Sequence, residues 1–148
     1  MLISVVNITE ELNPRKENMH MQAVKSYQKT SNQDFIESAS PEQVVHFLLS
    51  QLKSELNKLN SCIQNKDMSG KADSMTKVLM NIHVLGTSLD FEKGGVIATN
   101  LFQLYEHIRL VSIKASQENN HDILKSALTV ASEIEDAWKS LIELSKQI

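Results

Sequence analysis

Apolar residues return every three or four positions from about residue 44 to the end of the chain, which is the spacing of one face of an α-helix. The first such stretch predicts a helix with a clear start, since Ser40 is a good N-cap, Pro41 suits the first helical position and Gln43 completes a capping box. Polar residues 65–71 predict its end. The apolar side of this helix consists of Val45, Leu48, Leu52, Leu56, Leu59 and Ile63.

Three further helices are predicted in the same way. The second carries Met75, Leu79, Ile82, Leu85 and Leu89, the third carries Ile97, Leu101, Leu104, Ile108, Val111 and Ala115, and the fourth carries Ala127, Val130, Ile134, Ala137, Leu141 and Leu144. Polar residues 116–122 separate the last two helices, and Asn119 or Asn120 is expected to cap the fourth. Short connections make successive helices antiparallel neighbours, so we predict an all-α fold, an antiparallel up-down four-helix bundle.

The first 39 residues lack this regular spacing. We expect residues 1–21 to form a flexible N-terminal arm and residues 22–148 to form a single helical domain, with a short extra helix near 23–29. A chain of 148 residues is long enough to bury the core of one such domain.

Several of the predicted helices have more apolar surface than one seam requires. This surplus consists of a second band on the fourth helix, residues outside the apolar side of the third helix, and residues that flank the apolar side of the first helix. A wide buried face is the more common explanation, and an exposed groove for a partner helix is the alternative. The surplus residues are Leu124, Leu128, Trp138 and Ile142, then Val96, Phe102 and Tyr105, then Phe47 and Leu49.

Charge and composition narrow the class of protein. The net charge is −3 and both signs are mixed along the chain, which does not indicate a nucleic-acid surface. No stretch approaches the roughly 20 apolar residues of a membrane span, and no basic residue before Arg15 marks a signal peptide. Cys62 is the single cysteine, so an intramolecular disulfide is impossible. We therefore expect a soluble protein of the cytosol, without membrane insertion.

No group of residues in the sequence indicates catalysis, a metal or a cofactor. No two histidines stand four positions apart on one helix, and Glu118 to His121 is a single Glu-x-x-His where a di-iron bundle needs two. Phosphate-binding glycine loops and nucleophile elbows are missing too. The sequence predicts a protein that is not an enzyme.

The stretch Ser88–Ile108, SLDFEKGGVIATNLFQLYEHI, is the most distinctive in the chain. Together with SYQ at 26–28, SASPEQVVHFLL at 38–49 and AWK at 137–139, it resembles the FliS family, the flagellin-specific export chaperones of the bacterial flagellum. The likeness covers about Ala23 to Ile142. It implies a helical bundle that binds the disordered C-terminal segment of flagellin, prevents premature polymerisation and delivers flagellin to the type III export gate, without a nucleotide.

The resemblance also implies particular contacts. Val24 and Tyr27 occupy positions implicated in contact with the membrane protein of the export gate. Use of the same surface by an anti-sigma factor or a regulator of flagellin synthesis stays open, as does a competing hypothesis, a helical-bundle adaptor whose helical partner is not flagellin. The residues expected to line the flagellin groove are Phe47, Leu49, Gly94, Gly95, Ile97, Ala98, Leu101, Leu104 and Tyr105.

The adjacent glycines Gly94 and Gly95 need a physical reason, because each glycine in a helix costs about 1 kcal/mol relative to alanine. One reason is a turn that requires a positive φ angle. The other is close approach of a partner backbone to Gly94, Gly95 and Ala98. Both interpretations are open at the level of sequence and they are compatible.

Four positions at three places depart from the family pattern, and the start of the chain is unusual. Ser50-Gln51 stands where Asp-Gly is common. Ser116 follows Ala115 where the family often has Ala-Asn at the end of the third helix, and His107 replaces a common aromatic residue. These changes affect the expected groove shape but not the fold. The arm before Tyr27 is longer than usual in the family, so residues 1–18 are either a mis-assigned start or a species-specific extension.

Overall fold

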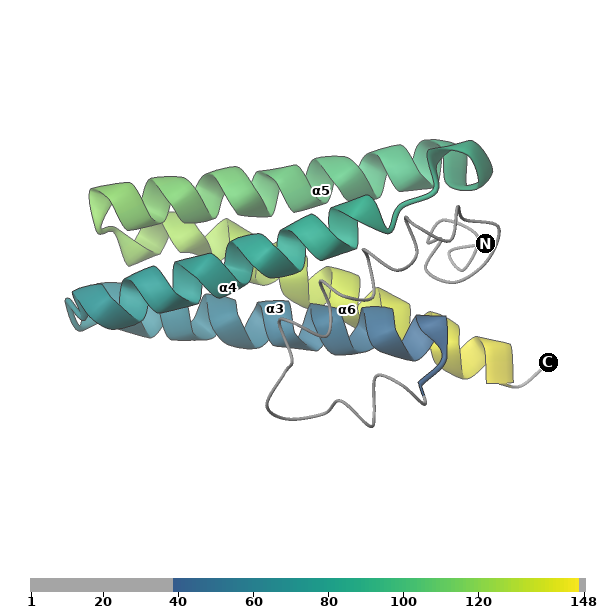
Figure 1. Cartoon of the computed structure of the whole chain (residues 1–148), viewed down its shortest axis with the longest axis horizontal. Coiled ribbons are helices and arrows are strands. Elements are labelled where there is room, and N and C mark those ends of the chain that lie inside the picture. Colours follow the sequence, from purple (N-terminus) through teal and green to yellow (C-terminus); the bar gives the residue numbers. More distant parts are fainter. Residues whose placement is uncertain (1–38, 147–148) are drawn as a thin grey trace, which may run out of the picture.

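Four long helices and one short 3-10 helix make up residues 39–146, the part of the chain that the computed structural model describes (Figure 1). Successive long helices run antiparallel, and the prediction of an all-α bundle is confirmed. The expected arm at 1–21, the helix near 23–29, Val24 and Tyr27 lie outside the described residues. The elements are α3 (Pro41–Gln64), α4 (Met68–Thr87), α5 (Phe91–Glu118), η2 (His121–Leu124) and α6 (Lys125–Lys146).

Helix α3 begins at the cap that its sequence predicts. The Ser40 hydroxyl accepts a hydrogen bond from the Gln43 backbone N–H at 3.3 Å, and the Gln43 side chain accepts one from the Ser40 backbone N–H at 3.0 Å. Pro41 follows the cap and has no N–H that would need a partner. These contacts satisfy donors that the first turn of a helix leaves unpaired.

The centre of the bundle is built around α3. All apolar positions predicted for this helix are buried, and Leu52, Leu56 and Leu59 have no exposed surface. Fully burying one such side chain stabilises the fold by about 1.5–3 kcal/mol. The remaining core comes from the other helices and includes Val78, Ile82, Leu85, Ile108, Leu124, Ala127, Ala131 and Trp138.

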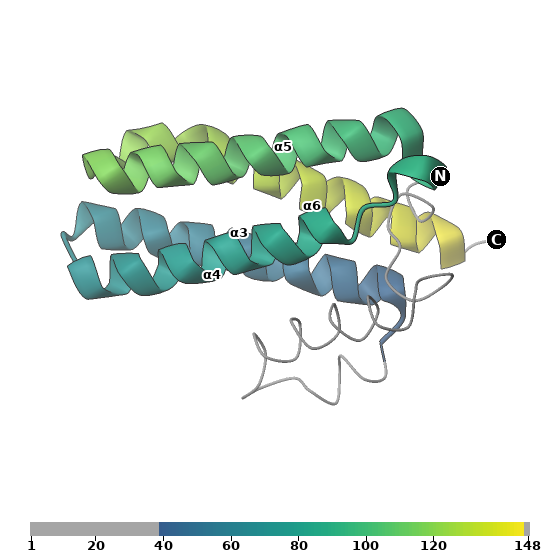
Figure 2. The same cartoon turned by 45° about the horizontal axis from the view of Figure 1, so that its top comes forward.

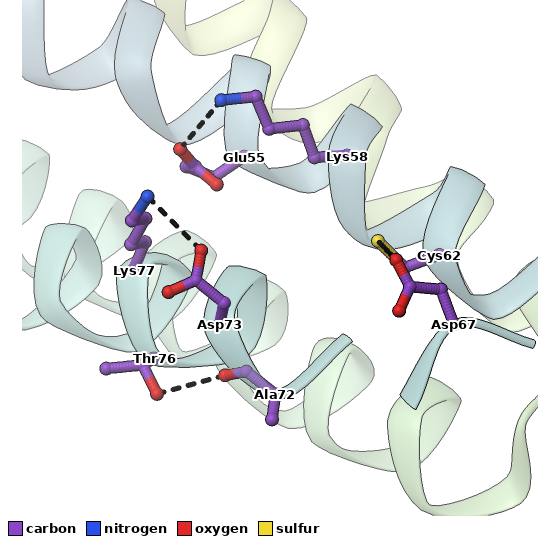
Figure 3. A network of polar contacts seen from close by, with 8 residues as sticks. All are labelled: Glu55, Lys58, Cys62, Asp67, Ala72, Asp73, Thr76 and Lys77. Atoms are coloured by element: carbon purple, nitrogen blue, oxygen red, sulfur yellow. Dashed lines mark hydrogen bonds and ion pairs between the residues drawn. The ribbon is translucent and has the colours of Figure 1, made fainter. Parts of the chain in front are cut away.

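A short turn at Asn65–Asp67 joins α3 to α4. Lys66 has a positive φ of 57°, and Asp67 caps α4 by accepting a hydrogen bond from the Gly70 N–H at 3.0 Å. The Cys62 thiol lies 3.9 Å from the Asp67 carboxylate, a contact drawn in Figure 3. The single cysteine is thus half-buried beside a helix cap.

Ion pairs lie on the facing sides of α3 and α4. Glu55 contacts Lys58 at 3.4 Å on α3, and Asp73 contacts Lys77 at 3.3 Å on α4 (Figure 3). The side chains of Asp73 and Lys77 are both exposed, and exposed pairs of this kind contribute less than about 1 kcal/mol, whereas in the other pair Lys58 is exposed and Glu55 is buried. Burial of apolar side chains therefore dominates the packing of these two helices.

The double glycine lies at the start of α5. Asp90 caps this helix by accepting a hydrogen bond from the Lys93 N–H at 2.9 Å, and Gly95 then interrupts the helix with φ 51° and ψ −125°. A Cβ atom on Gly95 would meet no atom within 4 Å, so the glycine is required by the backbone conformation and not by lack of space. Across the kink the rings of Phe91 and Phe102 pack edge to face, with centroids 5.9 Å apart.

The glycines allow a matched test of this explanation. We expect Gly95→Ala to lower the free energy of unfolding by about 1–3 kcal/mol, because alanine is strained at this positive φ. Gly86→Ala, within α4 and also without a neighbour within 4 Å, should raise it by about 0.5 kcal/mol. Urea denaturation monitored by circular dichroism measures both. Equal stabilities of the two variants would contradict the assignment of the kink to Gly95.

Two asparagines form the connection between α5 and α6. Asn119 ends α5 in the left-handed conformation, and Asn120 caps η2 by accepting a hydrogen bond from the Asp122 N–H at 3.0 Å. The Lys71 ammonium donates to the Ser116 carbonyl at 3.0 Å and to the Asn119 side chain at 2.7 Å, which ties the start of α4 to the end of α5. The predicted cap therefore initiates the short 3-10 turn that leads into α6.

Helix α6 does not stay beside α5 along its length. Figures 1 and 2 show that it starts next to the end of α5 and finishes next to the start of α3. Hydrogen bonds fix both ends of this course: His107 Nε2 and Ser126 Oγ lie 3.1 Å apart, and the Trp138 indole N–H donates to the Glu42 carbonyl at 2.9 Å. The divergence of α5 and α6 positions the candidate site.

Candidate partner-binding groove

The buried side of α5 differs from the one that the sequence predicts. Ile108 and Ala115 are buried as expected, but Ile97 is 45% exposed and Leu104 is 38% exposed. Tyr105, which the pattern places outside the apolar side, is only 3% exposed, and burial raises the pKa of its hydroxyl far above the usual range. The residues that actually face the interior are Ala98, Tyr105, Ile108, Ser112 and Ala115.

Small residues explain why the buried side of α5 differs from the predicted side. Ala98, Ser112 and Ala115 have no exposed surface, so the α5 backbone packs closely against the interior along this line. A pattern based on large apolar residues gives such positions little weight. The larger side chains of Ile97 and Leu104 are consequently turned toward the surface next to α6.

Helix α6 shows the same division between core and surface. Trp138, which the pattern assigned to a second band, is 4% exposed and belongs to the core. Of the expected apolar side, Ala127 and Ile134 are buried, whereas Ala137 is exposed and Leu144 is 57% exposed. Val130 and Leu141 are half-buried.

A pocket of about 220 Å³ lies between these two helices, and we call it the α5–α6 groove. Close to one end, the hydrogen bond between His107 and Ser126 holds the helices together. The indole N–H of Trp138 is already bonded to Glu42, so Trp138 offers the groove mainly apolar ring surface. The groove is lined by Leu101, Leu104, Val130, Glu133, Ile134, Ala137 and Trp138.

Apolar side chains extend the groove beyond the pocket. Ile97 stands one helical turn before Leu101 on α5, and Leu141 stands one turn after Ala137 on α6. Leu144 continues the line on α6. Adjacent exposed apolar residues on a folded protein are typical of a surface that another molecule covers.

The groove residues proposed from the sequence are only partly brought together. Ile97, Leu101 and Leu104 lie on the groove side of α5, Phe47 is half-buried on α3, and Gly94 and Gly95 lie at the kink. The side chains of the other three are buried in the core of the bundle and not in the groove: Leu49, Ala98 and Tyr105. The contributions of α6 were missed, although one of them, Trp138, was among the surplus apolar residues of the sequence.

A polar contact holds α6 against α3 on the side of α6 away from the groove. The Glu135 carboxylate accepts hydrogen bonds from the Ser50 hydroxyl and from the Lys53 ammonium, the latter at 3.4 Å. Burial alone would raise the pKa of Glu135, but these hydrogen bonds and the nearby charges of Lys53 and His46 outweigh it, so the pKa is lowered.

This contact predicts a pH dependence of stability. A lowered pKa in the folded protein stabilises it above the pKa of the unfolded chain, and this contribution is lost as the pH falls through the folded value. We expect Ser50→Ala to lose about 1 kcal/mol of stability at pH 7, with the difference from the unmodified protein shrinking below about pH 4. Urea denaturation at a series of pH values measures this. A difference that does not change with pH would contradict it.

Two other hollows lie on the described surface. One beside α3 is lined mostly by polar residues, among them Lys53, Asn57 and Ser61, and one on α4 is a shallow depression around Leu79 and Met80. Only the α5–α6 groove combines an apolar lining with a tryptophan among these three. We therefore take it as the candidate site.

Two other kinds of site are absent from the described part of the chain. Between residues 39 and 146, no group of three or more His, Cys, Asp or Glu side chains is arranged to hold a metal ion. None of the helices in that range has the length and apolar character needed to cross a membrane.

The fold and the groove define the class: an all-α helical bundle with an exposed apolar groove between its last two long helices. The chain belongs to the FliS family, described as flagellar protein FliS, whose model matches residues 23–145. It is 30% identical to the flagellar secretion chaperone FliS of Salmonella typhimurium over 80% of this chain and 88% of that protein. It is 28% identical to the FliS of Vibrio cholerae over 80% and 88%, and 25% identical to FliSB of Pseudomonas aeruginosa over 82% and 96%.

Proposed function

We propose that this protein is a cytosolic flagellar secretion chaperone that binds the disordered C-terminal segment of flagellin in the α5–α6 groove. Binding keeps flagellin from polymerising early and delivers it to the type III export gate. The observation that supports this most directly is the apolar groove left where α6 diverges from α5. The names of the related chaperones supply the pathway in which such a groove acts.

The energetics favour an extended guest with several contacts. Each large apolar side chain that moves from water into the groove contributes about 1.5–3 kcal/mol. Ordering a disordered segment costs about 2–5 kcal/mol, so one or two contacts are insufficient. The line from Ile97 to Leu104 on α5, facing the line from Val130 to Leu144 on α6, offers contacts over several helical turns.

A helix is the guest conformation that suits this surface. An amphipathic helix laid between α5 and α6 would cover the apolar side chains that a closed bundle would otherwise bury. It would also satisfy its own backbone hydrogen bonds, which an extended strand could not do against a helical surface.

Calorimetric titration with the C-terminal segment of flagellin tests the proposal. We expect saturable 1:1 binding, and no binding of flagellin that lacks this segment. Trp138 is the only tryptophan of the chain and lies in the groove, so a segment without tryptophan should also change its fluorescence. Absence of binding by both methods would favour the alternative, a helical-bundle adaptor with a different helical partner.

Delivery to the export gate is the second part of the proposal. Val24 and Tyr27 are the residues that we assign to contact with the gate protein, on the strength of the family resemblance. Double substitution of Val24 and Tyr27 by alanine should therefore reduce flagellin secretion while leaving flagellin binding unchanged. An anti-sigma factor or a regulator of flagellin synthesis that uses the groove would compete with flagellin in the same titration.

A further inference from the structure

One charged side chain, Glu133, lies in an otherwise apolar groove. The remaining residues that line the α5–α6 groove are leucine, valine, isoleucine, alanine and tryptophan. Glu133 is exposed, and within residues 39–146 no hydrogen bond or ion pair engages its carboxylate. By contrast Glu135, two positions later, is bonded to Ser50 and Lys53.

Among residues 39–146, the helical neighbours of Glu133 and the groove lining include no lysine or arginine. On a helix, the residues three and four positions away are the neighbours that could pair with it. At Glu133 these neighbours include no lysine or arginine, and one of them, Asp136, adds a second negative charge. Across the groove α5 contributes only leucines to the lining. The four neighbours on α6 are Thr129, Val130, Asp136 and Ala137.

A guest that covers the groove must therefore replace the water that hydrates this carboxylate. An entirely apolar guest would remove water from Glu133 without replacing its hydrogen bonds, which opposes binding. A guest with a lysine or arginine at this point would instead form a charge-assisted hydrogen bond. The long aliphatic part of such a side chain would also cover apolar surface of the groove.

We propose that Glu133 selects and orients the guest of the α5–α6 groove, by pairing with one lysine or arginine set within the apolar face of the guest helix. This inference rests on the proposed function for its statement that the guest is the flagellin segment. A single charge at one point of an apolar groove allows one register and disfavours guests that carry an acid there. Glu133 is thus a specificity-determining residue.

The first test uses the flagellin C-terminal segment in calorimetric titrations at low and high salt. We expect Glu133→Lys to weaken binding by about tenfold or more, and Glu133→Gln to weaken it less and to reduce its salt dependence. Glu118→Lys is the matched control, since it makes the same charge change at an exposed residue that does not line the groove, and its effect should stay within about twofold. Binding by Glu133→Lys at the unmodified affinity would overturn the inference.

The second test does not depend on flagellin. It uses pairs of synthetic amphipathic helices that differ at one position of the apolar face, which is lysine in one peptide and glutamate in the other. This position lies at a different point along the face in each pair. Trp138 fluorescence reports binding. In at least one pair the lysine peptide should bind about tenfold more tightly to the unmodified protein, and Glu133→Lys should invert this preference. Absence of such a preference, or of any binding, would overturn the inference. Failure of flagellin alone to bind would reject only the proposed function.

Discussion

Ala137→Glu should weaken binding of the flagellin C-terminal segment by about 100-fold or more, equivalent to about 2.7 kcal/mol, without unfolding the protein. Ala137 is exposed in the empty groove, so the new carboxylate is hydrated until a guest covers it. Covering it then leaves a buried charge without a partner. In our inference, Glu133, one turn earlier, already pairs with the basic residue of the guest. The second carboxylate therefore has no counter-ion.

Calorimetric titration measures the affinity of Ala137→Glu, and urea denaturation measures its stability. We expect its free energy of unfolding to stay within about 0.5 kcal/mol of the unmodified value, the cost of a like-charge pair on a helix surface. Ala72→Glu, at an exposed alanine of α4, is the matched control and should bind flagellin normally. Unchanged affinity of Ala137→Glu would place the flagellin site outside the α5–α6 groove.

Glutamate at position 98, in place of Ala98, should instead destabilise the fold. Ala98 has no exposed surface, so Ala98→Glu forces a longer, charged side chain into the packed interior of α5. An unpaired buried charge costs about 3–5 kcal/mol, a large part of the roughly 5–15 kcal/mol that holds a domain folded. We expect this variant to be largely unfolded or to denature at a much lower urea concentration.

A smaller change at the same site provides the control for Ala98→Glu. Ala98→Gly introduces no charge and no bulk, and it should cost only about 1 kcal/mol through the lower helix propensity of glycine. Circular dichroism during urea denaturation compares the two variants. If Ala98→Glu were as stable as the unmodified protein, Ala98 would have to be accessible, and the partner contact that the sequence suggested for it would stand again.

The start of α3 and its core side were predictable because each feature rests on local chemistry. The Ser40 cap with Pro41 and Gln43 needs only neighbouring residues, and the large leucines of α3 mark the side that the bundle buries. The kink at Gly95 was predictable in kind, because two adjacent glycines in a helix need a conformational or a contact reason. In each of these cases the structure is determined by residues that are close together in the sequence.

The groove was less predictable because it depends on how two helices diverge. Ile97 and Leu104 have the spacing of core residues, and only the rotation set by the small residues of α5 turns them outward. The contribution of α6 depends on its crossing toward α3, which is fixed by the contact of Trp138 with Glu42, 96 positions away in the sequence. No pattern within one helix contains that information.

Trp138 links the α5–α6 groove to the start of α3. Its ring is part of the groove, while its nitrogen is anchored to the backbone at Glu42, two residues beyond the N-cap Ser40. A ligand that tilts the indole must therefore strain or break this hydrogen bond in the first turn of α3. A guest that shifts the indole would thus loosen the first turn of α3, and amide exchange in that turn would register it.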